Sequence, residues 1–119
     1  MFMDDCIFCK IIRGEVSCEK IYEDDSFFAF LDAAPQVKGH TLIVPKKHFE
    51  NLMDIDEKFS ENYIKAIRKV GKILIEKYNA DGFNVVLNNG EAAGQIVNHV
   101  HFHILPRKKG DGYFFGLKK

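Results

Sequence analysis

The longest hydrophobic pattern in the chain is helical. From residue 57 to 78, apolar residues recur at three- and four-residue spacing, the period of one face of an α-helix. Asp54 and Glu57 resemble a capping box at the start of this helix, and residues 79–82 supply a stop. A second and much shorter helix is predicted over residues 6–12.

Short apolar runs bounded by turn residues predict the strands. They cover residues 21–22, 27–31, 41–44, 83–87 and 99–105. These strands flank one long helix without regular alternation of strand and helix. The order therefore favours an α+β fold, with a five-stranded antiparallel sheet and the long helix on one face, over a doubly wound parallel sheet.

Composition and charge narrow the class of protein. The 119 residues suit a single domain spanning 1–119, and the 46% hydrophobic content is that of a globular protein. Seventeen Lys and Arg balance seventeen Asp and Glu, so net charge gives no case for a nucleic-acid or membrane surface. Asp4 and Asp5 stand where a signal peptide would carry positive charge, and we expect a cytoplasmic protein.

The clearest chemical signal is the segment 99–106, in which histidine alternates with apolar residues. In a strand, its apolar side chains would face the core and its histidines the opposite side, about 6.6 Å apart. The histidines are His99, His101 and His103. A solvated strand face is disfavoured, because such faces usually carry Lys, Glu and Thr. A metal site and catalysis by imidazole, as nucleophile or acid–base, remain as alternatives.

Cys6 and Cys9 form a second candidate site. Cysteines three residues apart fall on one side of a helical turn, so both thiolates can reach one metal ion. A redox pair is less favoured, because no thioredoxin-like βαβ pattern surrounds it. His40 has no motif role, and we expect a surface or hydrogen-bonded histidine. Cys18 is expected to be a small, half-buried thiol.

The alternating segment resembles the motif of the histidine triad (HIT) family, and the resemblance covers nearly the whole chain. Matching segments in the family's order are residues 6–12, 22–24, 29–32, 45–48 and 89–95. The match is to the Hint branch, and particularly to its small bacterial members. It implies a HIT-like fold that dimerises into a continuous sheet, and a nucleotide-binding hydrolase or transferase.

The resemblance assigns catalytic roles to four residues. The family's middle histidine, here His101, attacks the α-phosphate of a purine nucleoside 5′-phosphoramidate or related conjugate, giving a nucleotidyl-histidine that water hydrolyses. His103 matches a phosphate contact, while Asn88 and Gln95 match residues that position the phosphate and leaving group. Taken alone, Asn88 and Gln95 fit ordinary turn residues equally well. Dinucleoside polyphosphate hydrolysis and non-catalytic nucleotide sensing are the alternative functions.

The resemblance also implies a purine nucleotide pocket and a structural zinc ion. Asp32 matches the acidic residue that binds the ribose hydroxyls. The apolar residues that match the purine pocket, each of which would singly suit a core position, are Phe8, Val16, Phe30 and Leu31. The implied zinc ligands are Cys6, Cys9, His48 and His99.

Two departures from the family pattern bear on activity. Ile96 stands where relatives commonly have a Ser or Thr hydroxyl that contacts phosphate. An isoleucine cannot make that hydrogen bond, which predicts lower catalytic power. The tail, residues 107–119, lacks the Trp-containing ending of eukaryotic Hint proteins and looks more like bacterial members. Because this tail helps to define substrate preference in relatives, the leaving group of this protein is left open.

Overall fold

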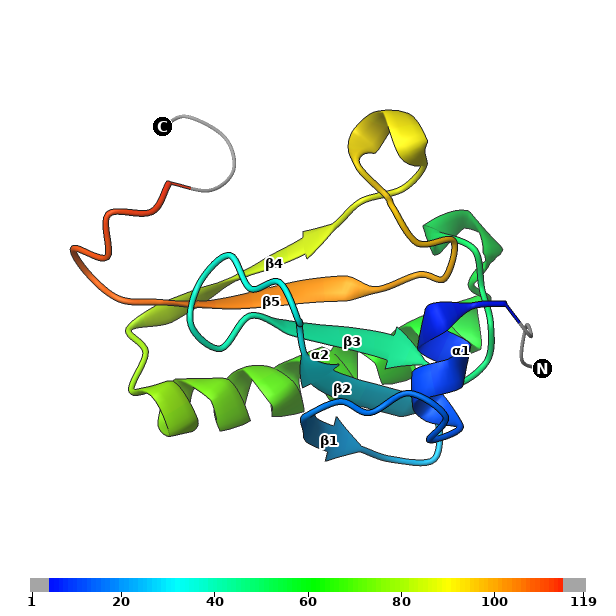
Figure 1. Cartoon of the computed structure of the whole chain (residues 1–119), viewed down its shortest axis with the longest axis horizontal. Helices are drawn as coiled ribbons and strands as arrows, with labels where there is room; N and C mark the ends of the chain where they lie inside the picture. The colour runs from blue at the N-terminus through cyan, green and yellow to red at the C-terminus, as the bar shows by residue number, and fades with distance from the viewer. Residues whose placement is uncertain (1–4, 115–119) are drawn as a thin grey trace.

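The computed structural model describes residues 5–114, and these form one antiparallel sheet between two helices (Figure 1). Residues 1–4 and 115–119 lie outside the described part, and with them Asp4 and the end of the tail. The elements are α1 (Ile7–Ile12), β1 (Lys20–Glu23), β2 (Phe27–Leu31), β3 (Thr41–Pro45), the 3₁₀ helix η1 (Leu52–Asp54), α2 (Glu57–Tyr78), β4 (Gly82–Leu87), the 3₁₀ helix η2 (Glu91–Ala93) and β5 (Phe102–Arg107). The strand order is β1-β2-β3-β5-β4, which confirms the predicted α+β architecture.

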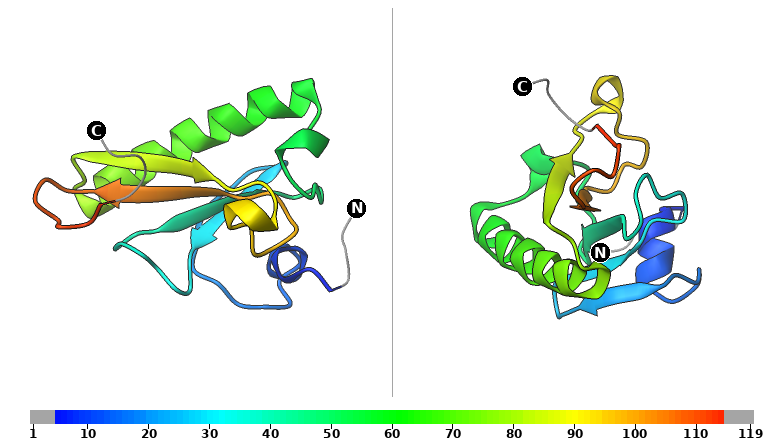
Figure 2. Two further views of the ribbon diagram at one scale, coloured as in Figure 1. Left: turned by 90° about the horizontal axis from the view of Figure 1, so that it is seen from above. Right: turned by 90° about the vertical axis from the view of Figure 1, so that its left-hand side faces the viewer.

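The two helices cover opposite faces of the sheet, as Figure 2 shows. Because side chains alternate along a strand, β2 sends Phe27 and Ala29 into the core under α2. Phe28 and Phe30 of the same strand enter a second core under α1. The central strand β3 is likewise buried on both faces, which explains its continuous apolar run. The side chains that α2 contributes to its core are Tyr63, Ala66, Ile67, Val70 and Leu74.

Helix α2 has the predicted bounds, but the predicted capping box is wrong. The N-cap is Asp56, whose side chain accepts a backbone N–H of the first turn. Asp54 instead closes a capping box with Asn51 at the start of η1. The helix ends at Asn79, a left-handed residue with φ 51° in the predicted stop. Within residues 5–114, no helix is long and apolar enough to cross a membrane.

The prediction that all three histidines lie on one strand is also wrong. β5 begins at Phe102, because the strands on both its sides pair no further than this residue. His99 and His101 therefore lie in the segment that leads into β5. In that segment the backbone N–H of Val100 donates to the carbonyl of Phe49, at 2.7 Å, outside the sheet. The alternation of faces nevertheless persists, since Val100 packs in the core under α2.

Candidate active site and metal centre

His101 is buried on the α1 side of the molecule, with 4% of its surface exposed. Its Nδ1 lies 2.8 Å from the carbonyl oxygen of His99. A carbonyl only accepts, so Nδ1 carries the proton and the lone pair of the neutral ring is on Nε2. Burial lowers the pKa of His101 and keeps the ring neutral, while the bond to His99 and the charge of Asp32 act in the opposite direction. The ring is therefore in the form that a nucleophile requires.

His103 lies beside His101. It is the first residue of β5 whose side chain is on this face of the sheet. The two ring centroids are 5.0 Å apart. Burial and the neighbouring His101 and His40 lower the pKa of His103 to about 4, so this ring is neutral as well. His103 opens onto a small cavity of about 60 Å³. The other residues that line this cavity are Gln36, His40, Val86, Asn88 and Leu105. Asn88 and His103, both predicted site residues, thus share one cavity.

Gln95 has a different environment from Asn88. Its side chain is buried, and its Oε1 accepts the backbone N–H of Gly90 at 2.7 Å. Its Nε2 donates to the carbonyls of Glu50, at 2.7 Å, and Val97, at 3.0 Å. Both N–H bonds of the amide are thus used within the protein. Gln95 fixes the loop around η2 against the segment that follows β3.

Most of the predicted nucleotide-binding residues lie on the same side of the sheet as the histidines, but alternation along β2 places Leu31 on the opposite face, with Phe27 and Ala29. Asp32 directly follows β2, and its side chain is 24% exposed. Its Oδ1 accepts the backbone N–H of Ala34 at 3.0 Å, which fixes the carboxylate. Of the predicted purine pocket, Phe8, Phe30 and Val16 belong to the core under α1, and Leu31 is half-buried. Phe8 also packs its ring against His101, with centroids 4.9 Å apart.

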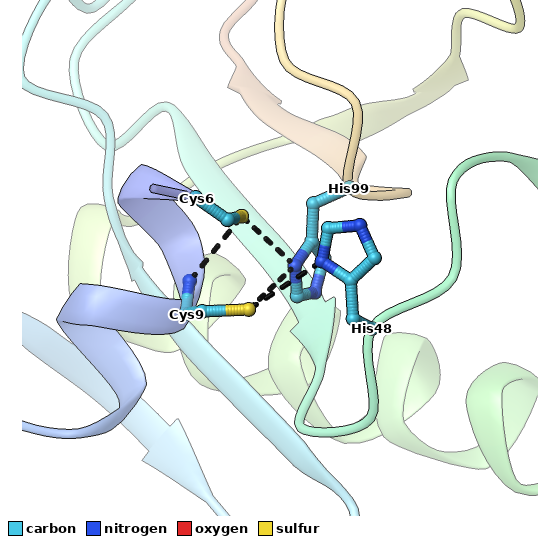
Figure 3. A group of neighbouring side chains, drawn as sticks. All are labelled: Cys6, Cys9, His48 and His99. Carbon is cyan, nitrogen blue, oxygen red and sulfur yellow. Dashed lines mark hydrogen bonds between the residues drawn. The ribbon is translucent and has the colours of Figure 1, made fainter. Parts of the chain in front are cut away.

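Four predicted metal ligands meet at one point, although they come from three parts of the chain (Figure 3). Cys6 and Cys9 belong to the first turn of α1, His48 follows β3, and His99 precedes β5. The Cys6 Sγ and Cys9 Sγ atoms lie 3.4 and 3.6 Å from His99 Nδ1. The Cys9 Sγ atom lies 3.4 Å from His48 Nδ1.

These distances fit a tetrahedral zinc site. With zinc–sulfur bonds of about 2.3 Å and zinc–nitrogen bonds of about 2.0 Å, sulfur and nitrogen ligands lie roughly 3.5 Å apart. The tautomer of His99 fits too, because its Nε2 donates to the carbonyl of Pro45 at 2.9 Å. The lone pair is therefore on Nδ1, which faces the thiols, in the usual arrangement of a metal-bound histidine. The chemistry and the spacing of all four residues suit a closed structural site.

Sequence reasoning missed one residue of the site. His40 is buried, with 2% exposure, and its Nε2 lies 2.9 Å from His103 Nδ1. It is therefore a hydrogen-bonded histidine and not a surface one. The available signal was its position two residues before Leu42, the register partner of His103, but this required knowing that β3 pairs with β5. The prediction for Cys18 is wrong, because this thiol is exposed.

Comparisons with known proteins show the family to which the chain belongs. The HIT domain profile matches residues 13–110. A HIT-like protein of Methanocaldococcus jannaschii is 53% identical over 107 residues, 90% of this chain and 82% of the relative. The adenosine 5′-monophosphoramidase hnt1 of Schizosaccharomyces pombe is 39% identical over 112 residues, 94% of this chain and 80% of the relative.

Solved structures show the same fold. The crystal structure of a HIT family member from Bacillus subtilis has a TM-score of 0.89 and 43% identity, covering 98% of this chain and 83% of that one. A zinc-bound histidine triad protein from Mycobacterium smegmatis has a TM-score of 0.88 and 37% identity, covering 93% and 81%. With its profile match, its relatives and its fold, the chain belongs to the HIT family.

Proposed function

We propose that this protein is a nucleotide hydrolase that cleaves a purine nucleoside 5′-phosphoramidate, or a related nucleotide conjugate, at the α-phosphorus. The observation that carries this proposal is the state of His101. Its Nδ1–H is held by the carbonyl of His99, and its neutral Nε2 keeps the lone pair. The name of the Schizosaccharomyces pombe relative, an adenosine 5′-monophosphoramidase, supports the same substrate class.

The reaction proceeds in two displacements at phosphorus. The Nε2 of His101 attacks the α-phosphorus, and a new P–N bond forms as the bond to the leaving amine breaks. The amine departs with a proton taken from water. The ring is now a cationic nucleotidyl-imidazolium, and its Nδ1–H bond to the His99 carbonyl favours that charge. Water then displaces His101 and gives up a proton to the hydroxide that the first step left in solvent, which releases the nucleoside monophosphate and restores the neutral ring.

Residues around His101 hold the nucleotide. Asp32 accepts hydrogen bonds from the ribose hydroxyls, and His103 and Asn88, which share one cavity, contact phosphate oxygens. The purine lies over the apolar surface that Val16 borders, above the packed Phe8 and Phe30 rings. Gln95 acts by shaping the loop around η2, in which the backbone N–H groups of Gly90, Ala93, Gly94 and Gln95 all donate within the protein.

We also infer that Cys6, Cys9, His48 and His99 hold one structural zinc ion. The ion would cross-link α1 to the two segments that flank it in space. His99 then has two tasks, since its ring binds the metal and its carbonyl orients His101. We assign this ion no role beyond the structural one, because two thiolates and two imidazoles complete its tetrahedral coordination.

The protein is further proposed to form a homodimer through the β4 edge of the sheet. In the order β1-β2-β3-β5-β4, one side of strand β4 is unpaired among the described residues 5–114. Its Phe83 and Val85 are exposed, at 39% and 43%, as is Ile64 of α2, at 55%. Pairing two such edges would extend the sheet through both subunits and cover these apolar side chains.

Turnover of adenosine 5′-phosphoramidate tests the proposed function. The wild type should release AMP, and His101→Ala should lower the rate by roughly 10³-fold or more while still binding AMP. Failure of the wild type to turn over this substrate would overturn the proposal. In that case two further measurements distinguish the alternative functions. Cleavage of a dinucleoside polyphosphate would indicate that substrate class. AMP binding without turnover of either compound would indicate a sensing module, which the missing hydroxyl at Ile96 favours.

A further inference from the structure

His40 is a buried titratable residue with no part in the mechanism above. It directly precedes β3, with 2% of its surface exposed, and faces the same cavity as His103. Both of its ring nitrogens have partners. The backbone N–H of Gln36 lies 3.1 Å from Nδ1, and Nε2 lies 2.9 Å from His103 Nδ1. Such complete satisfaction of a buried ring indicates a defined protonation state.

The bond with the N–H of Gln36 determines the direction of the bond between His40 and His103. A backbone N–H only donates, so the Nδ1 of His40 must accept and carries a lone pair. The proton of the neutral His40 ring is therefore on Nε2, which donates to Nδ1 of His103. His103 Nδ1 in turn carries a lone pair, and the proton of that neutral ring is on Nε2. Burial lowers the pKa of both rings, in keeping with two neutral imidazoles.

Two other partners for His40 Nε2 are less suitable. Asp32 Oδ2 lies 3.6 Å from this nitrogen, against 2.9 Å for His103, so the shorter bond takes the proton. A cation shared by Asp32, His40 and His103 would need its two nitrogen ligands about 3.3 Å apart, at metal–nitrogen distances near 2.0 Å. The observed 2.9 Å is a normal hydrogen bond and is short for such a pair.

We propose that His40 is a positioning residue, which fixes His103 as the Nε2-protonated tautomer so that His103 presents an N–H to the phosphate oxygens of the substrate. The opposite tautomer would turn a lone pair towards an anionic oxygen and lose that bond. The identity of the substrate rests on the proposed function, but the tautomer of His103 does not.

The backbone around His40 is built to hold the ring in place. Gly39 has φ +85°, a conformation that side chains other than glycine rarely adopt. A Cβ atom there would lie 2.8 Å from the Tyr78 ring at the end of α2. The Thr41 hydroxyl donates to the carbonyl of Gly39 at 2.8 Å. The turn before β3 therefore has a defined backbone conformation, which places Nε2 of His40 against His103 of β5.

Nitrogen-15 NMR of the histidine side chains tests the tautomer directly, with or without substrate. Protonated and unprotonated ring nitrogens have distinct shifts, and His103→Asn identifies the signals of His103 by their loss. The wild type should show His103 with the proton on Nε2 and the lone pair on Nδ1. A proton on Nδ1, or an exchanging mixture of both forms, would overturn the proposal without any need for a folded variant at His40.

Two substitutions of His40 then test its effect on the reaction. His40→Phe keeps the ring volume but removes the donor, and should lower kcat for adenosine 5′-phosphoramidate by roughly 10- to 100-fold, as loss of a comparable orienting partner does. His40→Gln places an amide N–H near the position of Nε2, and should recover part of kcat and the Nε2-protonated signal of His103. The Kd for AMP should rise in His40→Phe as well, because AMP carries the phosphate that His103 contacts, and should recover in part in His40→Gln.

The possible failures are distinguishable. Equal kcat in the wild type and a folded His40→Phe would overturn the role of His40 and leave the proposed function intact. Equal losses in His40→Phe and His40→Gln, with the His103 tautomer unchanged in both, would also overturn it, because packing alone would then explain the loss. No turnover by the wild type would overturn the proposed function, while the NMR result would still decide the tautomer.

Discussion

Single backbone groups set the chemistry of the histidines at the residue scale. The Pro45 carbonyl holds Nε2–H of His99, and the His99 carbonyl holds Nδ1–H of His101. The N–H of Gln36 holds Nδ1 of His40 as an acceptor. Each ring thereby presents one specified nitrogen, which suits His99 to its proposed role as a metal ligand and His101 to its proposed role as a nucleophile. Rings of one residue type thus acquire different functions from their hydrogen-bond partners.

Asp32 should make the protein prefer ribonucleotides. A hydrogen bond from a hydroxyl to a charged acceptor contributes roughly 1.5–3 kcal/mol, or about 10- to 150-fold in affinity. AMP should therefore bind more tightly than its 2′,3′-dideoxy analogue by about this factor. Calorimetry with both ligands, on the wild type and on Asp32→Asn, is the measurement. The preference should shrink in the variant, and equal affinities of the wild type for the two ligands would contradict the assignment.

His103 should make stability depend on pH. Its pKa is about 4 in the folded protein against an ordinary value of 6.5, mainly because of burial. Between these values the unfolded chain binds more protons, so the contribution of His103 is complete above pH 6.5 and is lost as pH falls towards 4. A shift of this size corresponds to about 3 kcal/mol. Urea unfolding should show a flatter dependence on pH in His103→Asn, and identical slopes would exclude this origin.

Local pattern determined the elements that could be predicted. The helical period and the predicted stop at residues 79–82 placed both ends of α2 correctly. The apolar runs of β2 and β3 were found because both faces of these strands are buried. The start of β5 was misplaced, because it depends on where the neighbouring strands stop and not on the alternation of His99, Val100 and His101.

In the site, as in the fold, only the local contacts could be predicted from the sequence pattern. The approach of Cys6 and Cys9 follows from one helical turn. His48 and His99, which lie 39 and 90 positions from Cys9, could be added only through the family resemblance. The contact between His40 and His103 spans 63 positions and depends on the pairing of β3 with β5. The sequence therefore assigned His40 no role, because its contact with His103 depends on non-local strand pairing.

Zinc should be present in near-stoichiometric amount and should fix α1 to the site. A helix of six residues is marginal alone, so a cross-link to His48 and His99 contributes to its stability. Elemental analysis of protein purified without chelator should find zinc in the wild type and lose it in Cys6→Ser and His48→Ala, with a lower Tm. Cys18→Ser, which changes an exposed thiol elsewhere, is the matched control and should keep the metal.

Metal-free wild type with full stability would contradict the zinc site. Loss of zinc in Cys18→Ser as well would show that the metal binds exposed thiols without a defined site.

Of the two edges of the sheet, β4 is better suited than β1 to association with a second subunit. β1 carries exposed Lys20 and Glu23, which form an ion pair at 3.1 Å. β4 instead carries exposed Phe83 and Val85. Charged side chains on an edge discourage pairing, whereas an exposed apolar edge promotes it. The asymmetry of the two edges favours a dimer over an open chain of subunits.

Sedimentation equilibrium at micromolar concentration should therefore give the mass of a dimer. Val85→Lys should weaken the dimer and leave the fold unchanged, because this side chain is 43% exposed in the isolated chain. Met53→Lys, at an 86% exposed position of η1, is the matched substitution away from the edge and should leave the mass unchanged. A monomeric wild type would count against this interface.

We propose above all that His101 carries the nucleotide during the reaction. Rapid quenching of wild-type protein with adenosine 5′-phosphoramidate, followed by peptide mass spectrometry, tests it most directly. We expect an AMP adduct on the peptide that contains His101, located to that ring by fragmentation and absent from His101→Ala. Turnover by His101→Ala at the wild-type rate, or an adduct on His99 or His103 instead, would contradict it.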